Sequence, residues 1–143
     1  MLGINDTRRR KDRIIIDTNI WISFLLIGGF SKLDRIIKEN LCVLLFSIEL
    51  LEELTDVASR PKFRKYFPPE DLLDLLSQIE KNSEIINVVS VVERCRDPKD
   101  NFLLSLAHDG EATHIISGDR DLTDLGKFGK TTIVTIVEYL KGK

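Results

Sequence analysis

The sequence predicts an α/β domain in which helices cover both faces of a parallel β-sheet. Short apolar runs rich in β-branched residues alternate with segments of helical periodicity. The runs are almost continuously apolar, which is typical of strands buried on both faces. The length of 143 residues fits one domain, and no repeat or low-complexity linker divides the chain.

Five of these runs are the predicted strands. The first, "RIIID", contains three consecutive isoleucines, which favour a strand in the middle of a sheet. Because crossovers between parallel strands are right-handed, only a few doubly wound strand orders are compatible with this pattern. The predicted strands lie at 13–17, at 42–47, within 83–92, at 113–117 and at 131–136.

The segments between the strands have the spacing of amphipathic helices. In the segment 69–82, the apolar residues that line one side are Leu72, Leu73, Leu75, Leu76 and Ile79. The predicted helices lie at 19–27, 31–40, 48–59, 69–82, 100–109 and 136–141.

The amino-terminal residues are set apart by their charge. Residues 1–13 carry a net charge of +3, whereas the rest of the chain carries −5. We expect residues 1–12 to form a basic mobile extension and residues 13–143 to form the single domain. The basic run is either a solvated tail or a contact for nucleic-acid phosphates, and both interpretations stay open.

Composition argues against a membrane protein and against several kinds of site. The longest apolar runs are too short to span a bilayer, and the amino terminus lacks a secretory signal, so we expect a cytoplasmic protein. Cys42 and Cys95 form no Cys-x-x-Cys pair and are expected in or near the core. With only two histidines in the chain, a zinc site or a histidine-based triad is poorly supported.

Aspartates follow two of the predicted strands. Asp17 ends "RIIID", and Asp119 follows the strand at 113–117 after Gly118, which allows a sharp turn. In doubly wound sheets, sites form at the carboxyl ends of the strands. A role in a turn would also explain each aspartate taken alone.

Two further acids lie on predicted helices. Glu53 falls roughly 40° outside an apolar stripe and so borders a cleft, whereas Glu52 points nearly opposite that stripe. Asp100 shares a face with Leu103 and Leu104, where an unpaired carboxylate is costly. Glu53 is alternatively a surface residue, and Asp100 alternatively stabilises its helix terminus, as a capping Asp97 also would.

Four carboxylates at one edge of a sheet would repel one another, and a cation would relieve that repulsion. Carboxylate and water ligands suit Mg²⁺ or Mn²⁺, which also bind phosphate oxygens. Such ions activate water and neutralise charge on a phosphodiester. They would also allow an anionic substrate to approach an acidic site.

The order of these motifs resembles the PIN-domain family, and most closely its bacterial subgroup of toxin components, which are VapC-like metal-dependent ribonucleases. The resemblance rests on "DTN", "LLEEL", "DPKDNFLLSLA" and "SGDRDL" and covers about residues 13–141. It implies a three-layer α/β/α fold with a central parallel sheet of five strands in the order 3-2-1-4-5. That order makes the first and fourth strands neighbours, which would bring Asp17 and Asp119 together.

The resemblance also implies a set of site residues. Asn19 and Ser117 would orient the acids or the substrate; Ser117 stands where many family members have threonine. The acids carried over by motif as catalytic and metal-binding residues are Asp17, Glu53, Asp100 and Asp119, with Asp121 as a fifth metal-binding residue.

The function implied is an Mg²⁺- or Mn²⁺-dependent ribonuclease that cleaves single-stranded RNA with metal-activated water. In this subgroup the enzyme is the toxin of a toxin–antitoxin pair, so RNA and a cognate antitoxin protein are the expected partners. The resemblance and the leucine-rich segment 69–82 predict a homodimer formed through helices. The alternative is a catalytically inactive PIN fold that serves as an RNA-binding or scaffold module. The complete set of acids in this sequence argues against an inactive copy.

Overall fold

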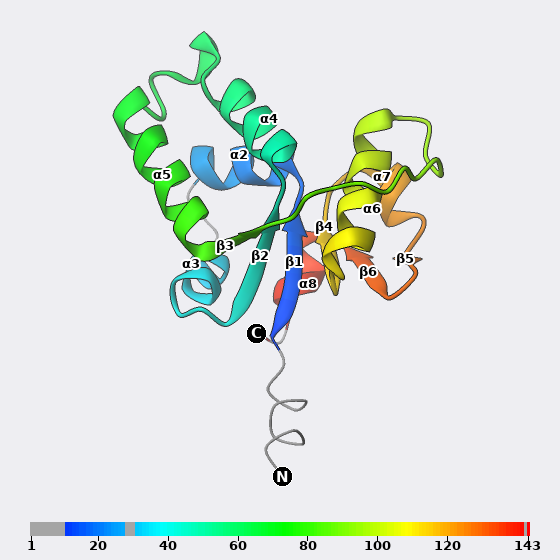
Figure 1. Ribbon diagram of the computed structural model, residues 1–143. Coiled ribbons are helices and arrows are strands. Elements are labelled where there is room, and N and C mark those ends of the chain that lie inside the picture. Colours follow the sequence, from blue (N-terminus) through cyan, green and yellow to red (C-terminus); the bar gives the residue numbers. More distant parts are fainter. Residues whose placement is uncertain (1–10, 28–30, 142) are drawn as a thin grey trace.

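The computed structural model describes residues 11–27, 31–141 and 143, and it has the predicted α/β architecture (Figure 1). The expected basic extension at 1–12 lies outside the described residues except for its last two. Asp12 already belongs to the first strand. The strands are β1 (Asp12–Ile16), β2 (Cys42–Phe46), β3 (Ser83–Ile85), β4 (His114–Ile116), β5 (Lys127–Phe128) and β6 (Thr131–Val134).

The strands form one sheet in the order β3-β2-β1-β4-β6-β5. The first five are parallel, so the predicted order 3-2-1-4-5 is confirmed with β6 as the fifth parallel strand. The short edge strand β5 is antiparallel and was not predicted. It has two residues, too few for a hydrophobic pattern, and it lies between Gly126 and Gly129, whose φ angles are +70° and +59°.

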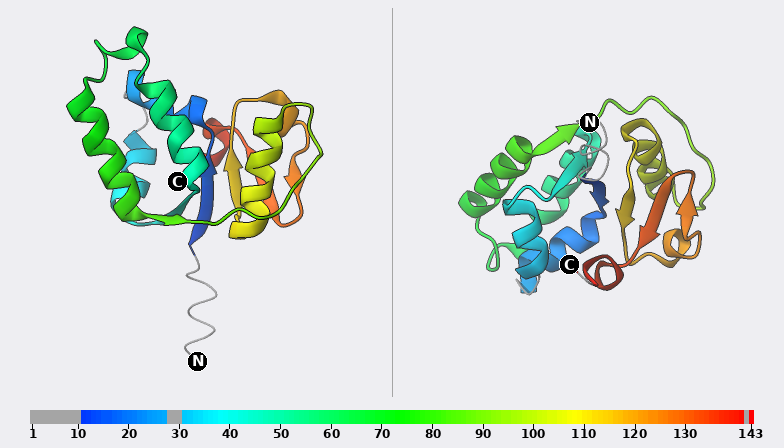
Figure 2. Two further views of the ribbon diagram at one scale, coloured as in Figure 1. Left: turned by 45° about the horizontal axis from the view of Figure 1, so that its top comes forward. Right: turned by 90° about the horizontal axis from the view of Figure 1, so that it is seen from below.

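Helices cover both faces of the sheet, as the two further views show, with α6 on one face and α8 on the other (Figure 2). The short helix α7, directly after Asp119, was not predicted because it has only four residues. The helices are α2 (Thr18–Ile27), α3 (Ser31–Lys38), α4 (Ile48–Ala58), the 3₁₀ helix η1 (Pro61–Phe63), α5 (Pro69–Asn82), α6 (Pro98–Gly110), α7 (Arg120–Thr123) and α8 (Ile136–Leu140).

The core lies between the sheet and these helices. Ile14, Ile15 and Ile16 of β1 are all buried, as expected for a central strand, and Trp21 of α2 packs against Phe46 of β2. The cysteines agree with their predicted places, because Cys42 is buried, Cys95 is half-buried and both are free thiols. The longest described helix, α5, has 14 residues, and no described helix is long and apolar enough to cross a bilayer.

The third predicted strand region continues as an extended strap, residues 86–97, which crosses the sheet to reach α6 (Figure 1). Three polar residues spaced four apart on α6 hold this strap by accepting hydrogen bonds from its backbone. Asp109 accepts from Val89 and Ser90, Ser105 accepts from Val92, and Asn101 accepts from Arg94 and Cys95. The strap thereby delivers the chain to Asp97, the N-cap of α6.

A polar network joins the last helix to the start of β1. The Tyr139 hydroxyl donates a hydrogen bond of 2.8 Å to Asp12 Oδ2, which also lies 3.4 Å from Lys143 Nζ. Tyr139 is buried and its ring contacts His114 edge-on. Burial and the neighbouring Asp12 raise the pKa of Tyr139, so its hydroxyl stays protonated and able to donate.

We expect Tyr139→Phe to lower the free energy of unfolding by about 1 kcal/mol, because a buried hydrogen bond is lost while the ring is retained. Urea denaturation checks this value. Tyr66→Phe is the matched control, since Tyr66 is 54% exposed and should tolerate the change. Equal stability of the Tyr139→Phe variant and the wild type would show that the network contributes nothing.

Candidate metal centre

A cleft of about 330 Å³ opens at the carboxyl ends of β1 and β4, between α4 and α6. Its position follows from the fold, because parallel strands end at one edge of the sheet and the two helices flank that edge. Four predicted acids line it together: Asp17, Glu53, Asp100 and Asp119.

Ser117 connects the ends of the two neighbouring strands. Its hydroxyl donates to Asp17 Oδ2 (2.8 Å) and accepts from the backbone N–H of Asp119 (3.0 Å). Ser117 is fully buried, so this bridge is held inside the protein. The backbone N–H of Asp17 also donates to the carbonyl of Ile116 (2.9 Å), which keeps the two strand ends in register. The pairing of β1 with β4 therefore brings Asp17 and Asp119 to one place.

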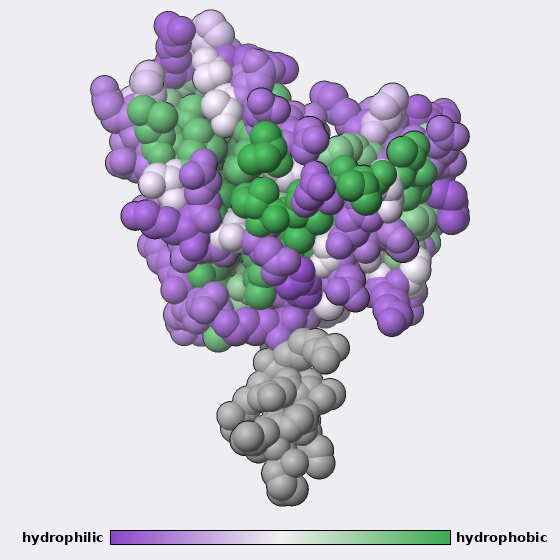
Figure 3. All heavy atoms as spheres, viewed as in Figure 1, coloured by the Kyte–Doolittle hydropathy of each residue, from purple (hydrophilic) through white to green (hydrophobic). Residues whose placement is uncertain are grey.

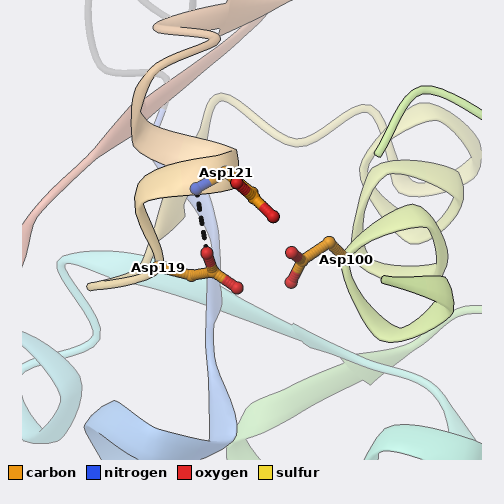
Figure 4. A group of neighbouring side chains, drawn as sticks. All are labelled: Asp100, Asp119 and Asp121. Carbon is orange, nitrogen blue, oxygen red and sulfur yellow. Dashed lines mark hydrogen bonds between the residues drawn. The ribbon is translucent and has the colours of Figure 1, made fainter. Parts of the chain in front are cut away.

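Asp100, Asp119 and Asp121 form the tightest acidic group of the described residues. Each offers a carboxylate oxygen, and these oxygens lie within 4.8 Å of one another. Figure 4 shows Asp100 pointing from α6 toward Asp119 and Asp121, which lie at the start of α7. Asp119 is the N-cap of α7 and accepts the backbone N–H of Asp121 at 2.9 Å, which fixes its orientation.

Asp100 is the most unusual member of this group. Its side chain is 4% exposed, and Oδ2 has no hydrogen-bond partner among the described residues. Burial, followed by the neighbouring Asp119, raises the pKa of Asp100 to about 7. Burial also raises the pKa of Asp17, and the charges of Glu53 and Asp119 contribute. Mutual repulsion in a partly dry site is thus a cost to the folded protein.

Glu53 lies on the opposite wall of the cleft. Thr18 Oγ1 donates a hydrogen bond of 2.6 Å to Glu53 Oε2, and Lys99 Nζ lies 3.5 Å from Oε1. Glu53 is half-buried, whereas Glu52 is exposed. The placement agrees with the orientation expected from the apolar stripe of α4.

Asp121 lies at the edge of the group, and Arg96 Nη2 approaches its carboxylate at 3.1 Å. Asn19 is exposed at the mouth of the cleft, and its backbone N–H is 3.5 Å from Asp17 Oδ1. Asp97 accepts the backbone N–H of Lys99 as the N-cap of α6, which is the structural role expected for it.

The donor set fits a hard divalent cation. All the ligand atoms on offer are carboxylate oxygens, which suit Mg²⁺ or Mn²⁺ better than softer metals. The unpartnered Oδ2 of Asp100 is a buried acceptor, and a cation would satisfy it. A cation would also relieve the repulsion that raises the pKa of Asp100.

Sequence reasoning did not identify three residues that contact these acids: Thr18, Arg96 and Lys99. Thr18 stands inside the "DTN" motif, yet its partner Glu53 is 35 residues away, so no local pattern reveals the contact. Arg96 precedes the "DPKD" motif and Lys99 lies inside it, and an exposed basic residue at either place is indistinguishable from an ordinary surface charge.

Comparisons with known proteins agree with this arrangement. A family profile described as "PIN domain" matches residues 13–121. The "Uncharacterized protein MJ1680" of Methanocaldococcus jannaschii is 36% identical over 118 residues, which cover 80% of this chain and 76% of that protein. No solved structure matches the chain. PIN domains are generally nucleases that use divalent metal ions, and the acidic group described above is compatible with that activity. The chain belongs to the PIN-domain family.

Proposed function

We propose that this protein is an Mg²⁺- or Mn²⁺-dependent endoribonuclease that cleaves single-stranded RNA. The observation that carries the proposal is the buried Asp100, whose Oδ2 lacks a partner beside the carboxylates of Asp119 and Asp121. A fold does not retain such a costly arrangement for stability alone. Family membership supplies the nuclease chemistry that this acidic site supports.

The acids of the cleft would hold the cation: Asp17, Glu53, Asp100 and Asp119, with Asp121 at the edge. The bound ion would supply an activated water and would neutralise charge on the phosphodiester. Ser117 orients Asp17 through its hydrogen bond, and Thr18 orients Glu53 in the same way. Asn19 is exposed at the mouth, where its amide is available to the substrate.

The proposal is tested with a labelled single-stranded RNA of mixed sequence. We expect cleavage with Mg²⁺ or Mn²⁺ and none in EDTA, because the acids need the cation to tolerate an anionic substrate. Restoring the metal after chelation should restore cleavage. A folded protein that cleaves none of several RNAs with any divalent metal would instead favour the catalytically inactive RNA-binding or scaffold module.

The toxin role, a cognate antitoxin protein and a homodimer are part of the same proposal. The exposed Leu73 on α5, with 67% of its surface accessible, supports a helix-mediated dimer. Leu76, three residues further along α5, lies on the same side of the helix as Leu73 and is only half-buried, so the two leucines offer a small apolar surface to a second copy. Light scattering at micromolar concentration is expected to give the mass of a dimer, and a monomer mass would contradict it.

A further inference from the structure

The connection between α4 and α5 is strongly basic. Residues 60–67, "RPKFRKYF", form what we call the basic tip, at the upper end of the molecule in Figure 1. It has four basic residues and no acidic residue, although the whole chain has a net charge of −2. Figure 3 shows mainly hydrophilic side chains over this end. The basic residues are Arg60, Lys62, Arg64 and Lys65.

The positive charge of the basic tip is mostly uncompensated. All four basic residues are exposed. Arg60 makes one long ion pair with Asp56, at 4.0 Å. Within the described ranges, Lys62, Arg64 and Lys65 pair with no carboxylate. The tip therefore offers its charges to a polyanion at little cost, since few internal ion pairs must break.

Aromatic residues alternate with these charges and hold them in place. Phe67 is buried, and Phe63 stacks on it with ring centroids 5.4 Å apart. Lys62 and Lys65 lie over the rings of Phe63 and Tyr66, at 5.1 and 5.2 Å. Tyr66 itself is 54% exposed, so its ring is available to stack on a base.

The basic tip continues the wall of the metal centre. Leu50, Glu53 and Val57 of α4 all line the cleft, and Arg60 follows three residues after Val57. At 1.5 Å per helical residue, about 7.5 Å of axis separates Glu53 from Ala58 at the end of α4. A chain that lies in the cleft and runs along α4 would reach the tip within a few nucleotides.

We propose that the basic tip binds single-stranded nucleic acid, with its cations on phosphates and Tyr66 stacked on a base. A single strand fits because its bases are free to stack, whereas those of a duplex are enclosed. The inference rests on the proposed function, since it assigns a binding site outside the cleft to the same substrate. Phosphate contact and stacking do not distinguish RNA from DNA, so the tip takes either.

The test is the affinity for a labelled 12-nucleotide RNA in EDTA, where no cleavage occurs. The triple variant K62A/R64A/K65A is expected to bind at least about tenfold more weakly, and its salt dependence should fall by about two units of slope. The matched control is K32A/R35A/K38A, which likewise removes two lysines and one arginine, here from the exposed side of α3. The control should bind the RNA like the wild type. For single-stranded DNA of the same sequence, the triple variant should again bind more weakly and the control should again bind like the wild type.

Stacking is tested separately at Tyr66. Tyr66→Ala should weaken binding several-fold without changing the salt slope, and Tyr66→Phe should retain the wild-type affinity. The inference is overturned if K62A/R64A/K65A binds the RNA as tightly as the wild type does. That result would favour a basic tip that recognises an acidic protein instead of nucleic acid. The inference is also overturned if the wild type shows no measurable binding. Cleavage of RNA in Mg²⁺ is measured independently. If the protein cleaves RNA but the tip variants bind it normally, the inference about the tip is wrong and the proposed ribonuclease function still stands.

Discussion

Asp17→Asn and Asp119→Asn are each expected to lower the rate of RNA cleavage by about 100-fold or more. Asparagine keeps the shape of the side chain but removes the charge that holds the cation. Folding should survive, because an amide oxygen can still accept from Ser117 at position 17 and can still cap α7 at position 119. Initial rates at saturating Mg²⁺ provide the measurement, with circular dichroism as the check on folding.

Matched variants separate a site effect from a general charge effect. Asp124→Asn makes the same substitution at an exposed position after α7, and Glu52→Gln changes the exposed neighbour of Glu53. Both should cleave RNA at nearly the wild-type rate, whereas Glu53→Gln should be slow. Cleavage that persists in both Asp17→Asn and Asp119→Asn would assign the activity to a contaminant or to another mechanism.

Asp100→Asn is expected to stabilise the metal-free protein but to slow the cleavage of RNA. In the metal-free protein it should raise the free energy of unfolding by about 1–2 kcal/mol, or roughly 3–10 °C in Tm, because a buried like-charge contact disappears. Thermal unfolding in EDTA measures the gain. Asp124→Asn is the control, since Asp124 is exposed and lies outside the cleft.

The pH dependence of this gain follows from the raised pKa of Asp100, about 7 in the fold against 3.8 in the unfolded chain. Above pH 7 the folded protein carries the full penalty of an ionised Asp100. As the pH falls from 8 toward 4, the folded state takes up a proton first, so the wild type gains stability and its difference from the variant shrinks. If the difference in free energy of unfolding between the two proteins stays constant from pH 8 to pH 4, the pKa of Asp100 is not raised in the folded protein.

A bound divalent metal should stabilise the wild type more than Asp100→Asn. Mn²⁺ is expected to raise the Tm of the wild type, because a ligand that binds only the folded state stabilises it. The shift should be much smaller for Asp100→Asn, which has lost a charged ligand. Equal shifts in the two proteins would mean that Mn²⁺ binds elsewhere.

The parallel sheet could be predicted from the sequence because the apolar runs that mark its buried strands are local patterns. Three consecutive isoleucines at 14–16 predict a buried central strand, and the structure buries all three. The strand order came from the family resemblance, and it placed Asp17 beside Asp119. Helical periodicity alone distinguished the half-buried Glu53 from the exposed Glu52.

Other features depend on contacts between distant residues, which no local pattern reveals. The hydrogen bond from Thr18 to Glu53 joins two helices, and the strap at 86–97 is held by α6 rather than by the sheet. The basic tip was overlooked for a different reason. Its charges are ordinary for a surface loop that follows a predicted helix, and only the fold shows that this helix lines the cleft as far as Val57.

The most direct test of metal-dependent hydrolysis is the chemistry of the RNA ends that the wild-type protein produces with Mg²⁺. Because water is the proposed attacking group, each cut should leave a linear phosphate monoester on one fragment and a hydroxyl on the other. Mass spectrometry of the fragments distinguishes these ends from a 2′,3′-cyclic phosphate. Linear ends whose formation stops in EDTA are the predicted result. Cyclic phosphate ends, or cleavage that continues in EDTA, would contradict the account.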